Sequence, residues 1–154
     1  MRQGAPVVIL LIEDDAAHAE IVRRNLADFR VANRLVHVRD GQAALDYLLH
    51  EAGYADLEPS YRPDLVLLDL RLPKVDGLEV LRRMRETESL KGIPVVILTT
   101  SADELDRVRA YDGGASSYLI KPVDFEKFTR LMEAFGFYWL VWNQFPEATA
   151  GSRP

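Results

Sequence analysis

Five residues of this sequence are of types that together suit phosphoryl chemistry. Glu13 and Asp14 are adjacent carboxylates, and Asp69 is a third carboxylate that interrupts a run of leucine and valine. Thr99 supplies a hydroxyl and Lys121 an ammonium group. Carboxylate oxygens suit Mg²⁺, which keeps several waters and favours phosphate as a further ligand. The set therefore predicts a magnesium site at which one carboxylate attacks a phosphoryl group.

Separate roles can be assigned within this set. Asp69 is the predicted phosphoacceptor and also a metal ligand, because burying its carboxylate beside two other acids is costly without a cation. Asp14 is predicted to bind Mg²⁺ directly, and Glu13 to assist directly or through water. The main-chain carbonyl of Arg71, two residues past Asp69, is predicted to supply another oxygen. The hydroxyl and the ammonium group are predicted to bind the phosphoryl oxygens.

The strands and helices that must position these residues can be predicted from the spacing of apolar residues, which alternates along the sequence between a strand pattern and a helix pattern. Short apolar runs are predicted to be buried strands, and they span Val7–Ile12, Leu35–Val38, Leu65–Leu70, Val95–Leu98 and Ser117–Ile120. The stretches between them have the spacing of helices, and Ala102–Tyr111 is expected to be a more exposed helix. This alternation predicts an α/β fold with a parallel sheet covered on both faces. Because ligands bind at the carboxyl ends of such strands, the residues that could do chemistry should gather at one edge.

Each polar residue taken alone also has a purely structural explanation. Acids near the start of a helix cap its amides and complement its dipole, and Asp15 is predicted to be such an N-cap. The three histidines, His18, His37 and His50, are isolated in the sequence and are predicted to be surface or cap residues rather than ligands. Only the combination of acids at neighbouring strand ends favours a metal site over these explanations.

Length and composition limit the possible classes of protein. The chain has 154 residues, a formal net charge of −5 and no cysteine. One domain of this size can bury a core without disulfides, and cysteine nucleophiles and cysteine metal sites are excluded. No apolar run approaches ~18 residues, so no membrane span is expected. The acidic balance argues against general nucleic-acid binding, and the start of the sequence has no signal-peptide pattern. We therefore expect a cytoplasmic protein.

Read in order, Glu13-Asp14, Asp69, Thr99 and Lys121-Pro122 resemble the bacterial response-regulator receiver domain. The loop Pro73…Asp76-Gly77 and the aromatic residue Tyr118 also match, and the resemblance covers about residues 7–135. It implies a flavodoxin-like fold with strand order 2-1-3-4-5. It also implies phosphorylation by a histidine kinase with Mg²⁺ as cofactor. Thr99 and Tyr118 would then be switch residues, and Lys121–Pro122 a cis peptide.

The C-terminal residues and the longer loop before the third strand resemble one subfamily of receivers. Residues 5–146 are predicted to form a single receiver domain, with 50–63 an inserted loop, 136–146 an aromatic C-terminal arm and 147–154 a disordered tail. Tyr138-Trp139-Leu140 followed by Phe145-Pro146 resembles the ending of the small stand-alone regulators of bacterial phytochromes. The expected kinase is therefore a bacteriophytochrome. The arm either folds back on its own domain or forms a homodimer; we favour a dimer interface, made by Phe137, Tyr138, Trp139, Trp142 and Phe145.

A different class of function is compatible with the same residues. A metal-dependent phosphotransferase or phosphatase could use an aspartyl nucleophile on a similar sheet. Such enzymes normally carry a second acid two residues after the nucleophile, and here that position is Arg71. The receiver interpretation is therefore preferred, with a protein that catalyses only its own phosphorylation and dephosphorylation.

Overall fold

The described part of the chain alternates between strands and helices. The structure, a computed structural model, describes residues 6–28, 32–51, 54–56, 61–111, 115, 117–122 and 124–136. In chain order the elements are β1 (Val7–Ile12), α1 (Ala16–Ala27), β2 (Asn33–Val38), α2 (Gly41–Leu49), β3 (Leu65–Asp69), α3 (Gly77–Glu86), β4 (Val95–Thr99), α4 (Ala102–Tyr111), β5 (Ser117–Ile120) and α5 (Phe125–Gly136). Among these helices none is long and apolar enough to cross a membrane.

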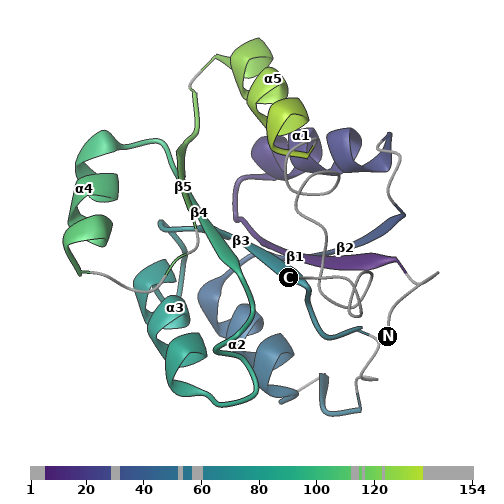
Figure 1. Cartoon of the computed structure of the whole chain (residues 1–154), viewed down its shortest axis with the longest axis vertical. Coiled ribbons are helices and arrows are strands. Elements are labelled where there is room, and N and C mark those ends of the chain that lie inside the picture. The colour runs from purple at the N-terminus through teal and green to yellow at the C-terminus, as the bar shows by residue number, and fades with distance from the viewer. Residues whose placement is uncertain are drawn as a thin grey trace, which may run out of the picture.

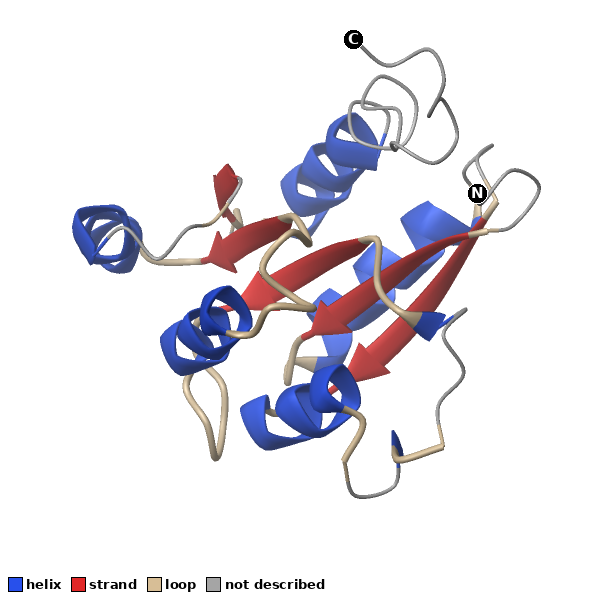
Figure 2. Cartoon of the chain, turned by 60° about the horizontal axis from the view of Figure 1, so that its bottom comes forward, coloured by secondary structure: helices blue, strands red, loops and turns tan. Residues whose placement is uncertain are grey.

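The strands form one parallel sheet in the order β2-β1-β3-β4-β5. Each neighbouring pair of strands is parallel, so the carboxyl ends share one edge, and Figure 2 shows the arrowheads of the long central strands pointing the same way. β1 and β3 occupy the centre, and their register pairs Leu11 with Leu67 and Ile12 with Leu68. This topology confirms the predicted flavodoxin-like fold. Because the reversal of strand order lies between β1 and β3, their ends flank the crevice in which such sheets bind ligands.

Helices cover both faces of the sheet. α1 and α5 lie on one side and α2 and α3 on the other, with α4 beside the β5 edge (Figure 1). Alternate residues of β1 enter the two cores, since Ile9 packs with α1 and α5 while Leu10 packs with α2 and α3. Both side chains are fully buried. A strand buried on both faces is apolar at every position, which explains the continuous hydrophobic runs of the central strands.

The strand limits differ slightly from the predicted ones. β1 and β5 have the predicted bounds, whereas β2 begins at Asn33, two residues before the predicted start. Asn33 and Arg34 are polar and half-buried because β2 is an edge strand, so apolar patterning misses them. β4 extends to Thr99, and β3 ends at Asp69. The last residue of each of these two strands is thus a predicted site residue.

Aspartates immediately precede α1, α2, α3 and α5, and Asp124 caps α5 through the Lys127 amide at 3.0 Å. Asp15, at the start of α1, accepts hydrogen bonds from the amides of Ala17 and His18, at 2.9 and 3.1 Å, which confirms the predicted N-cap. Asp40 caps α2 in the same way, through the Ala43 amide. Asp76 occupies the N-cap position of α3 but accepts no cap hydrogen bond through its side chain.

This difference allows a matched test of capping. Asp15→Ala is expected to lower the free energy of unfolding by about 1 kcal/mol, because two helix amides lose their acceptor. Asp76→Ala removes an N-cap carboxylate that makes no such bonds, so its cost should be smaller. Chemical denaturation of both variants measures the difference, and equal losses would mean that the charge near the helix end, and not the cap bonds, stabilises α1.

The segment predicted as an insertion packs on α2 and β2 through its described residues. The ring of Tyr54 meets that of Tyr47 edge-on, with ring centroids 5.1 Å apart. The Tyr47 hydroxyl donates to the Tyr61 carbonyl at 2.7 Å, and the Arg34 guanidinium lies 4.4 Å from the Tyr61 ring centroid. These aromatic contacts anchor both ends of the segment next to the β2 edge.

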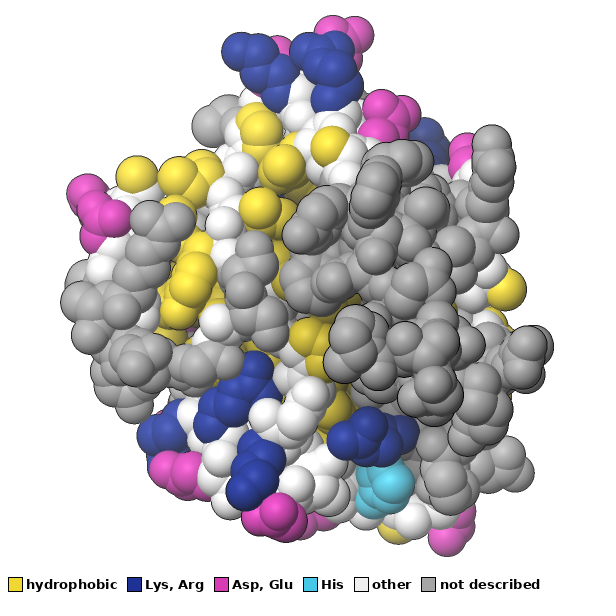
Figure 3. Space-filling view, in the orientation of Figure 1, with side chains coloured by type: hydrophobic (Ala, Val, Ile, Leu, Met, Phe, Trp, Pro, Cys, Tyr) yellow, Lys and Arg dark blue, Asp and Glu magenta, His cyan; other side chains and the backbone are white. Residues whose placement is uncertain are grey.

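On the face shown in Figure 3, Lys and Arg side chains lie next to Asp and Glu side chains along the lower edge. The helix surfaces carry ion pairs of this kind, for example between Arg82 and both Glu79 and Glu86. Exposed pairs contribute little to stability, since water screens them.

Two predictions concern residues outside the part of the chain that the structure describes. One is the dimer interface made by Phe137, Tyr138, Trp139, Trp142 and Phe145, and the other is the disordered tail at 147–154.

Candidate functional site

The predicted site residues meet at the carboxyl edge of the sheet. Glu13 follows β1, Asp69 ends β3, Thr99 ends β4 and Lys121 follows β5. All four are buried although they are polar, with exposed fractions of 1%, 7%, 1% and 2%. Asp14 is exposed beside them. Neighbouring parallel strands thus bring together residues that are far apart in the sequence, as predicted.

The three acids are close enough to share one cation. A carboxylate oxygen of each of Glu13, Asp14 and Asp69 lies within 4.8 Å of those of the other two. These are hard oxygen donors of the kind that Mg²⁺ prefers. Two of the carboxylates are buried and share a single ammonium group, so a divalent cation would balance the charge that remains. The residues therefore fit the predicted magnesium site.

Lys121 connects the two buried carboxylates. Its ammonium nitrogen lies 2.7 Å from Glu13 Oε1 and 3.2 Å from Asp69 Oδ2. A third contact, at 3.0 Å, joins it to Nδ1 of His18 in the first turn of α1. The ammonium group thus has one acceptor on each of three elements of the fold.

Burial controls the protonation of Glu13. Removal from water, which disfavours the charged form, raises the pKa of Glu13 to about 8. The neighbouring Asp69 carboxylate contributes to this rise and the Lys121 ammonium opposes it, and the value of about 8 is the net result. A cation bound at the acids would favour ionised Glu13, so metal binding and loss of this proton are linked.

His18 was not predicted to be part of the site. The sequence predicts an isolated surface or cap residue, whereas the structure places its Nδ1 3.0 Å from the Lys121 ammonium nitrogen. His18 lies three residues after the N-cap of α1, so its side chain reaches back over the carboxyl edge. Its ring also meets Phe128 of α5 edge-on, with ring centroids 5.2 Å apart. The spacing from the cap is a signal that sequence reasoning could have used.

Thr99 is hydrogen-bonded to a residue that the sequence did not indicate. Its hydroxyl donates to Glu104 Oε1 of α4 at 2.8 Å and accepts from the Ser101 amide at 3.1 Å. The other carboxylate oxygen of Glu104 accepts from Nε of Arg71 at 2.6 Å. Glu104 therefore links the residue two positions after Asp69 to the hydroxyl at the end of β4.

Arg71 also borders the pocket through its main chain. Its amide donates to Asp69 Oδ1 at 3.2 Å, so the two oxygens of Asp69 are held by different donors. Tyr118 of β5 is half-buried and packs against the core beneath α2 and α3. The Arg71 carbonyl as a metal ligand and Tyr118 as a switch residue stay predictions.

The expected cis peptide at Lys121–Pro122 is wrong for this structure. No cis bond occurs among the residues that the structure describes, and these two residues are among them. The trans form is favoured by about 0.5–1 kcal/mol even before proline. Here the Lys121 amide donates to the Thr99 carbonyl at 2.7 Å with the peptide bond that follows in the trans form.

Two glycines allow the loop after β3 to close on the site. A methyl group on Gly77 would lie 2.6 Å from the Asp69 carbonyl oxygen, and one on Gly41 would lie 1.8 Å from that of Val75. The Gly77 amide donates to Leu70 and the Gly41 amide to Pro73. The start of α2, the loop and Asp69 are thus in direct backbone contact.

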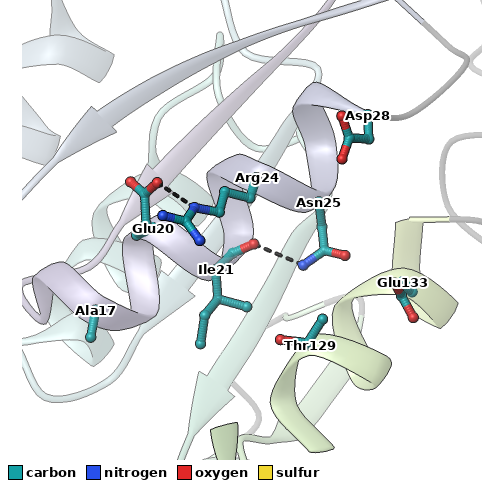
Figure 4. A pocket seen from close by; sticks show the side chains of 8 residues that line it. All are labelled: Ala17, Glu20, Ile21, Arg24, Asn25, Asp28, Thr129 and Glu133. Atoms are coloured by element: carbon teal, nitrogen blue, oxygen red, sulfur yellow. Dashed lines mark hydrogen bonds and ion pairs between the residues drawn. The ribbon is translucent and has the colours of Figure 1, made fainter. Parts of the chain in front are cut away.

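A hollow lies between α1 and α5, away from the acids. Its volume is about 450 Å³. Figure 4 shows Arg24 paired with Glu20 and the Asn25 amide turned to the Ile21 carbonyl, with Thr129 and Glu133 facing them from α5. None of the predicted pocket residues lines this hollow, so it is separate from the candidate site.

Comparison with known proteins gives the family of this chain. Residues 9–133 match the model of the response regulator receiver domain family. The chain is 50% identical to a probable methanogenesis regulatory protein, FilR2, of Methanothrix harundinacea, covering 92% of this chain and 88% of that protein. It is 38% identical to the response regulator Rcp1 of Synechocystis, covering 96% and 98%.

Solved structures give the same result. The phosphorylated cyanobacterial phytochrome response regulator RcpA superposes with a TM-score of 0.84 at 38% identity, covering 92% of this chain and 99% of that one. The Mn²⁺-bound form of Rcp1 gives a TM-score of 0.84 at 37% identity with the same coverage. The family match spans most of the chain, and it favours the receiver interpretation over that of a phosphatase. The chain belongs to the response regulator receiver domain family.

Proposed function

We propose that this chain is the phosphoacceptor of a two-component system and that Asp69 accepts the phosphoryl group from a histidine kinase. The observation that carries the proposal is the buried Glu13–Lys121–Asp69 cluster at the carboxyl edge of the sheet. Burying two carboxylates and an ammonium group is costly for stability alone, so the cluster is better explained by chemistry. Thr99, at the end of the next strand, completes the set.

The reaction is a transfer between two nucleophiles. An oxygen of the Asp69 carboxylate attacks the phosphorus, the P–N bond to the donor histidine breaks, and its electron pair returns to the imidazole. An acyl phosphate forms on Asp69. Lys121 donates to a phosphoryl oxygen, and the Thr99 hydroxyl turns from Glu104 to do the same. Packing around Tyr118 then changes, which alters the surface formed by α4, β5 and α5.

Mg²⁺ would be held by the carboxylates of Glu13, Asp14 and Asp69 with the Arg71 carbonyl. When bound it would neutralise charge on the phosphoryl oxygens. The Mn²⁺-bound form of the relative Rcp1 supports a divalent ion in this kind of pocket. The proposal leaves the chain with no reaction beyond gain and loss of its own phosphoryl group.

Incubation with acetyl phosphate and Mg²⁺ tests the proposal. We expect one phosphoryl group per chain, in an adduct that resists acid and is released by base, as acyl phosphates are. Intact-mass measurement after each treatment gives the stoichiometry. Release of many phosphates per chain without an accumulated adduct would instead support the alternative of a metal-dependent phosphatase.

The raised pKa of Glu13 predicts that Mg²⁺ binding depends on pH. Ionised Glu13 binds the metal and protonated Glu13 does not, so the apparent affinity should fall as the pH drops below about 8. Displacing one proton makes that fall about tenfold per pH unit. Without metal, the same shift stabilises the folded chain most below the ordinary Glu pKa of 4.5, and this contribution is lost as the pH rises towards 8.

Calorimetry in buffers of different ionisation enthalpy measures this linkage directly. We expect about one proton released per Mg²⁺ bound near pH 7. Glu13→Gln should abolish the proton release and flatten the pH dependence, at the cost of weaker binding. An affinity that does not change between about pH 6 and 8 would contradict the assignment of Glu13 to the metal site.

The kinase that donates the phosphoryl group is proposed to be a bacteriophytochrome. The likeness to RcpA over 92% of this chain supports this. The 50% identical relative, however, is named for regulation of methanogenesis, so kinases without a phytochrome sensor belong in the same experiment. A phosphotransfer time course with both kinds of kinase identifies the donor, because the cognate kinase should transfer the phosphoryl group fastest at equal concentration.

Signalling is proposed to act through contacts with a partner protein or a second copy of the chain. The aromatic segment 137–145 is proposed as the dimer contact. Light scattering coupled to size-exclusion chromatography at micromolar concentration tests this, and a monomer would exclude the dimer. A cytoplasmic location and a function without nucleic acid or membrane stay predictions from the sequence.

A further inference from the structure

The Lys121 ammonium group has an acceptor for each of its hydrogens. An ammonium carries three N–H donors and no acceptor. The three acceptors are Glu13 Oε1, Asp69 Oδ2 and His18 Nδ1. Since Lys121 is only 2% exposed, water does not readily replace a lost acceptor, and an unpaired N–H would be costly. His18 is the one member of the three that is not a carboxylic acid.

The imidazole of His18 packs against α5 and lies near the N-cap carboxylate of its own helix. Its ring lies edge-on against Phe128, at a ring-centroid distance of 5.2 Å and an interplanar angle of 83°. Its Nδ1 lies 3.7 Å from Asp15 Oδ2, on the N-cap of the same helix. Its side chain is 25% exposed. Burial and the nearby Lys121 charge lower the pKa of His18, which keeps Nδ1 free to accept.

The contact becomes important when Asp69 is phosphorylated. The N–H that points at Asp69 Oδ2 must then serve a phosphoryl oxygen, because the acyl phosphate carries its charge there. The direction of that N–H depends on the other two bonds of the ammonium group. The Glu13 carboxylate is also a proposed metal ligand, so its oxygens are not available to Lys121 alone. The His18 bond is therefore the one that the reaction leaves unchanged.

We infer that His18 is a positioning residue that aims the Lys121 ammonium group at the phosphoryl oxygens. The inference rests on the proposed function, since it concerns the transfer of a phosphoryl group to Asp69. In this role His18 would touch neither the phosphoryl group nor the metal. It acts through the geometry of Lys121, and its removal should slow the reaction without abolishing it.

Three substitutions separate the acceptor atom from the ring. His18→Phe keeps an aromatic ring against Phe128 and removes the nitrogen. His18→Asn places an amide oxygen close to the position of Nδ1, and His18→Gln places it near Nε2, beyond the reach of Lys121. His50→Asn is the control, because His50 is a C-cap with a φ of 58°, a conformation that asparagine tolerates.

The rate of phosphorylation by acetyl phosphate with Mg²⁺ is the main measurement. His18→Phe and His18→Gln should react about tenfold more slowly, equivalent to about 1.4 kcal/mol. His18→Asn should stay within about twofold of the unchanged chain, and so should the His50 control. In a Lys121→Met background, His18→Phe should have no further effect, because the residue that it positions is gone.

Each possible outcome has a distinct meaning. If the unchanged chain forms no adduct, the proposed function fails and the inference fails with it. If that chain reacts but His18→Phe is as fast, only the inference is overturned. Equal slowing of phosphorylation in His18→Phe and His18→Asn would indicate that the ring only packs, and would also overturn the inference. A slowing by His18→Phe that persists in the Lys121→Met background would have the same meaning. Thermal unfolding identifies a variant that does not fold. If His18→Phe is such a variant, the comparison of His18→Asn with His18→Gln tests the inference in its place.

Discussion

Asp69→Asn is expected to abolish acyl phosphate formation with acetyl phosphate and Mg²⁺. The amide has nearly the shape of the carboxylate but is not a nucleophile at neutral pH, so the loss should be complete within detection. The fold should survive. The Asp69 carboxylate helps to raise the pKa of Glu13, so its removal favours an ionised Glu13 that pairs with Lys121, and the unfolding midpoint without metal should not decrease.

A matched control lies at the other end of the same strand. Asp64, which immediately precedes β3, accepts a hydrogen bond from the Val8 amide at 2.8 Å, and an asparagine oxygen can accept it too. Asp64→Asn should therefore be phosphorylated to the same extent as the unchanged chain. Intact-mass measurement of both variants is sufficient. A residual adduct in Asp69→Asn would place the phosphoryl group on another residue, with Asp14 the first to test.

Gly41→Ala is expected to be the most destabilising of the single-methyl changes considered for this chain. The added methyl would lie 1.8 Å from the Val75 carbonyl oxygen and 2.6 Å from its carbonyl carbon. Backbone atoms cannot turn aside as a side chain can, so the loop after β3 must move away from α2. We expect a loss of about 3 kcal/mol in the free energy of unfolding, the upper range for overpacking. Because the same loop contacts the backbone of Asp69, phosphorylation should slow as well.

Gly92→Ala provides the comparison. A methyl on Gly92 meets no atom within 4 Å, so the change should be close to neutral. Denaturant titration of the two variants isolates the steric effect from the general effect of replacing glycine. If both variants unfold at the same denaturant concentration, the close approach of α2 and the loop does not exist in solution.

The sheet and the pocket could be predicted because their signals are local and strong. The central strands are apolar at every position, and Asp69 is recognisable as an acid in such a run. The order of the strands came from the family resemblance and not from the residues. The start of β2 was missed because Asn33 and Arg34 lie on an edge strand, where polar residues are tolerated.

Contacts between elements were much harder to predict. His18 joins Lys121 across 103 positions of the sequence, and no periodic pattern reports such a contact. Glu104 looks like an ordinary acid in the first turn of an exposed helix, yet its carboxylate binds both Thr99 and Arg71. The trans bond before Pro122 was missed for a different reason, because the family resemblance outweighed the intrinsic preference.

The hydrogen bond from Thr99 to Glu104 has a thermodynamic consequence. The donors that a phosphoryl group would use are already engaged in the resting chain: the Thr99 hydroxyl by Glu104 and the Lys121 ammonium by carboxylates. Phosphorylation therefore exchanges acceptors and adds few bonds, and an exchange yields only the difference between two bond energies, on the order of 1 kcal/mol. Resting and signalling conformations separated by so little interconvert readily. Among the residues that the structure describes, this engagement of the Thr99 hydroxyl and the Lys121 ammonium would make phosphorylation of the pocket readily reversible.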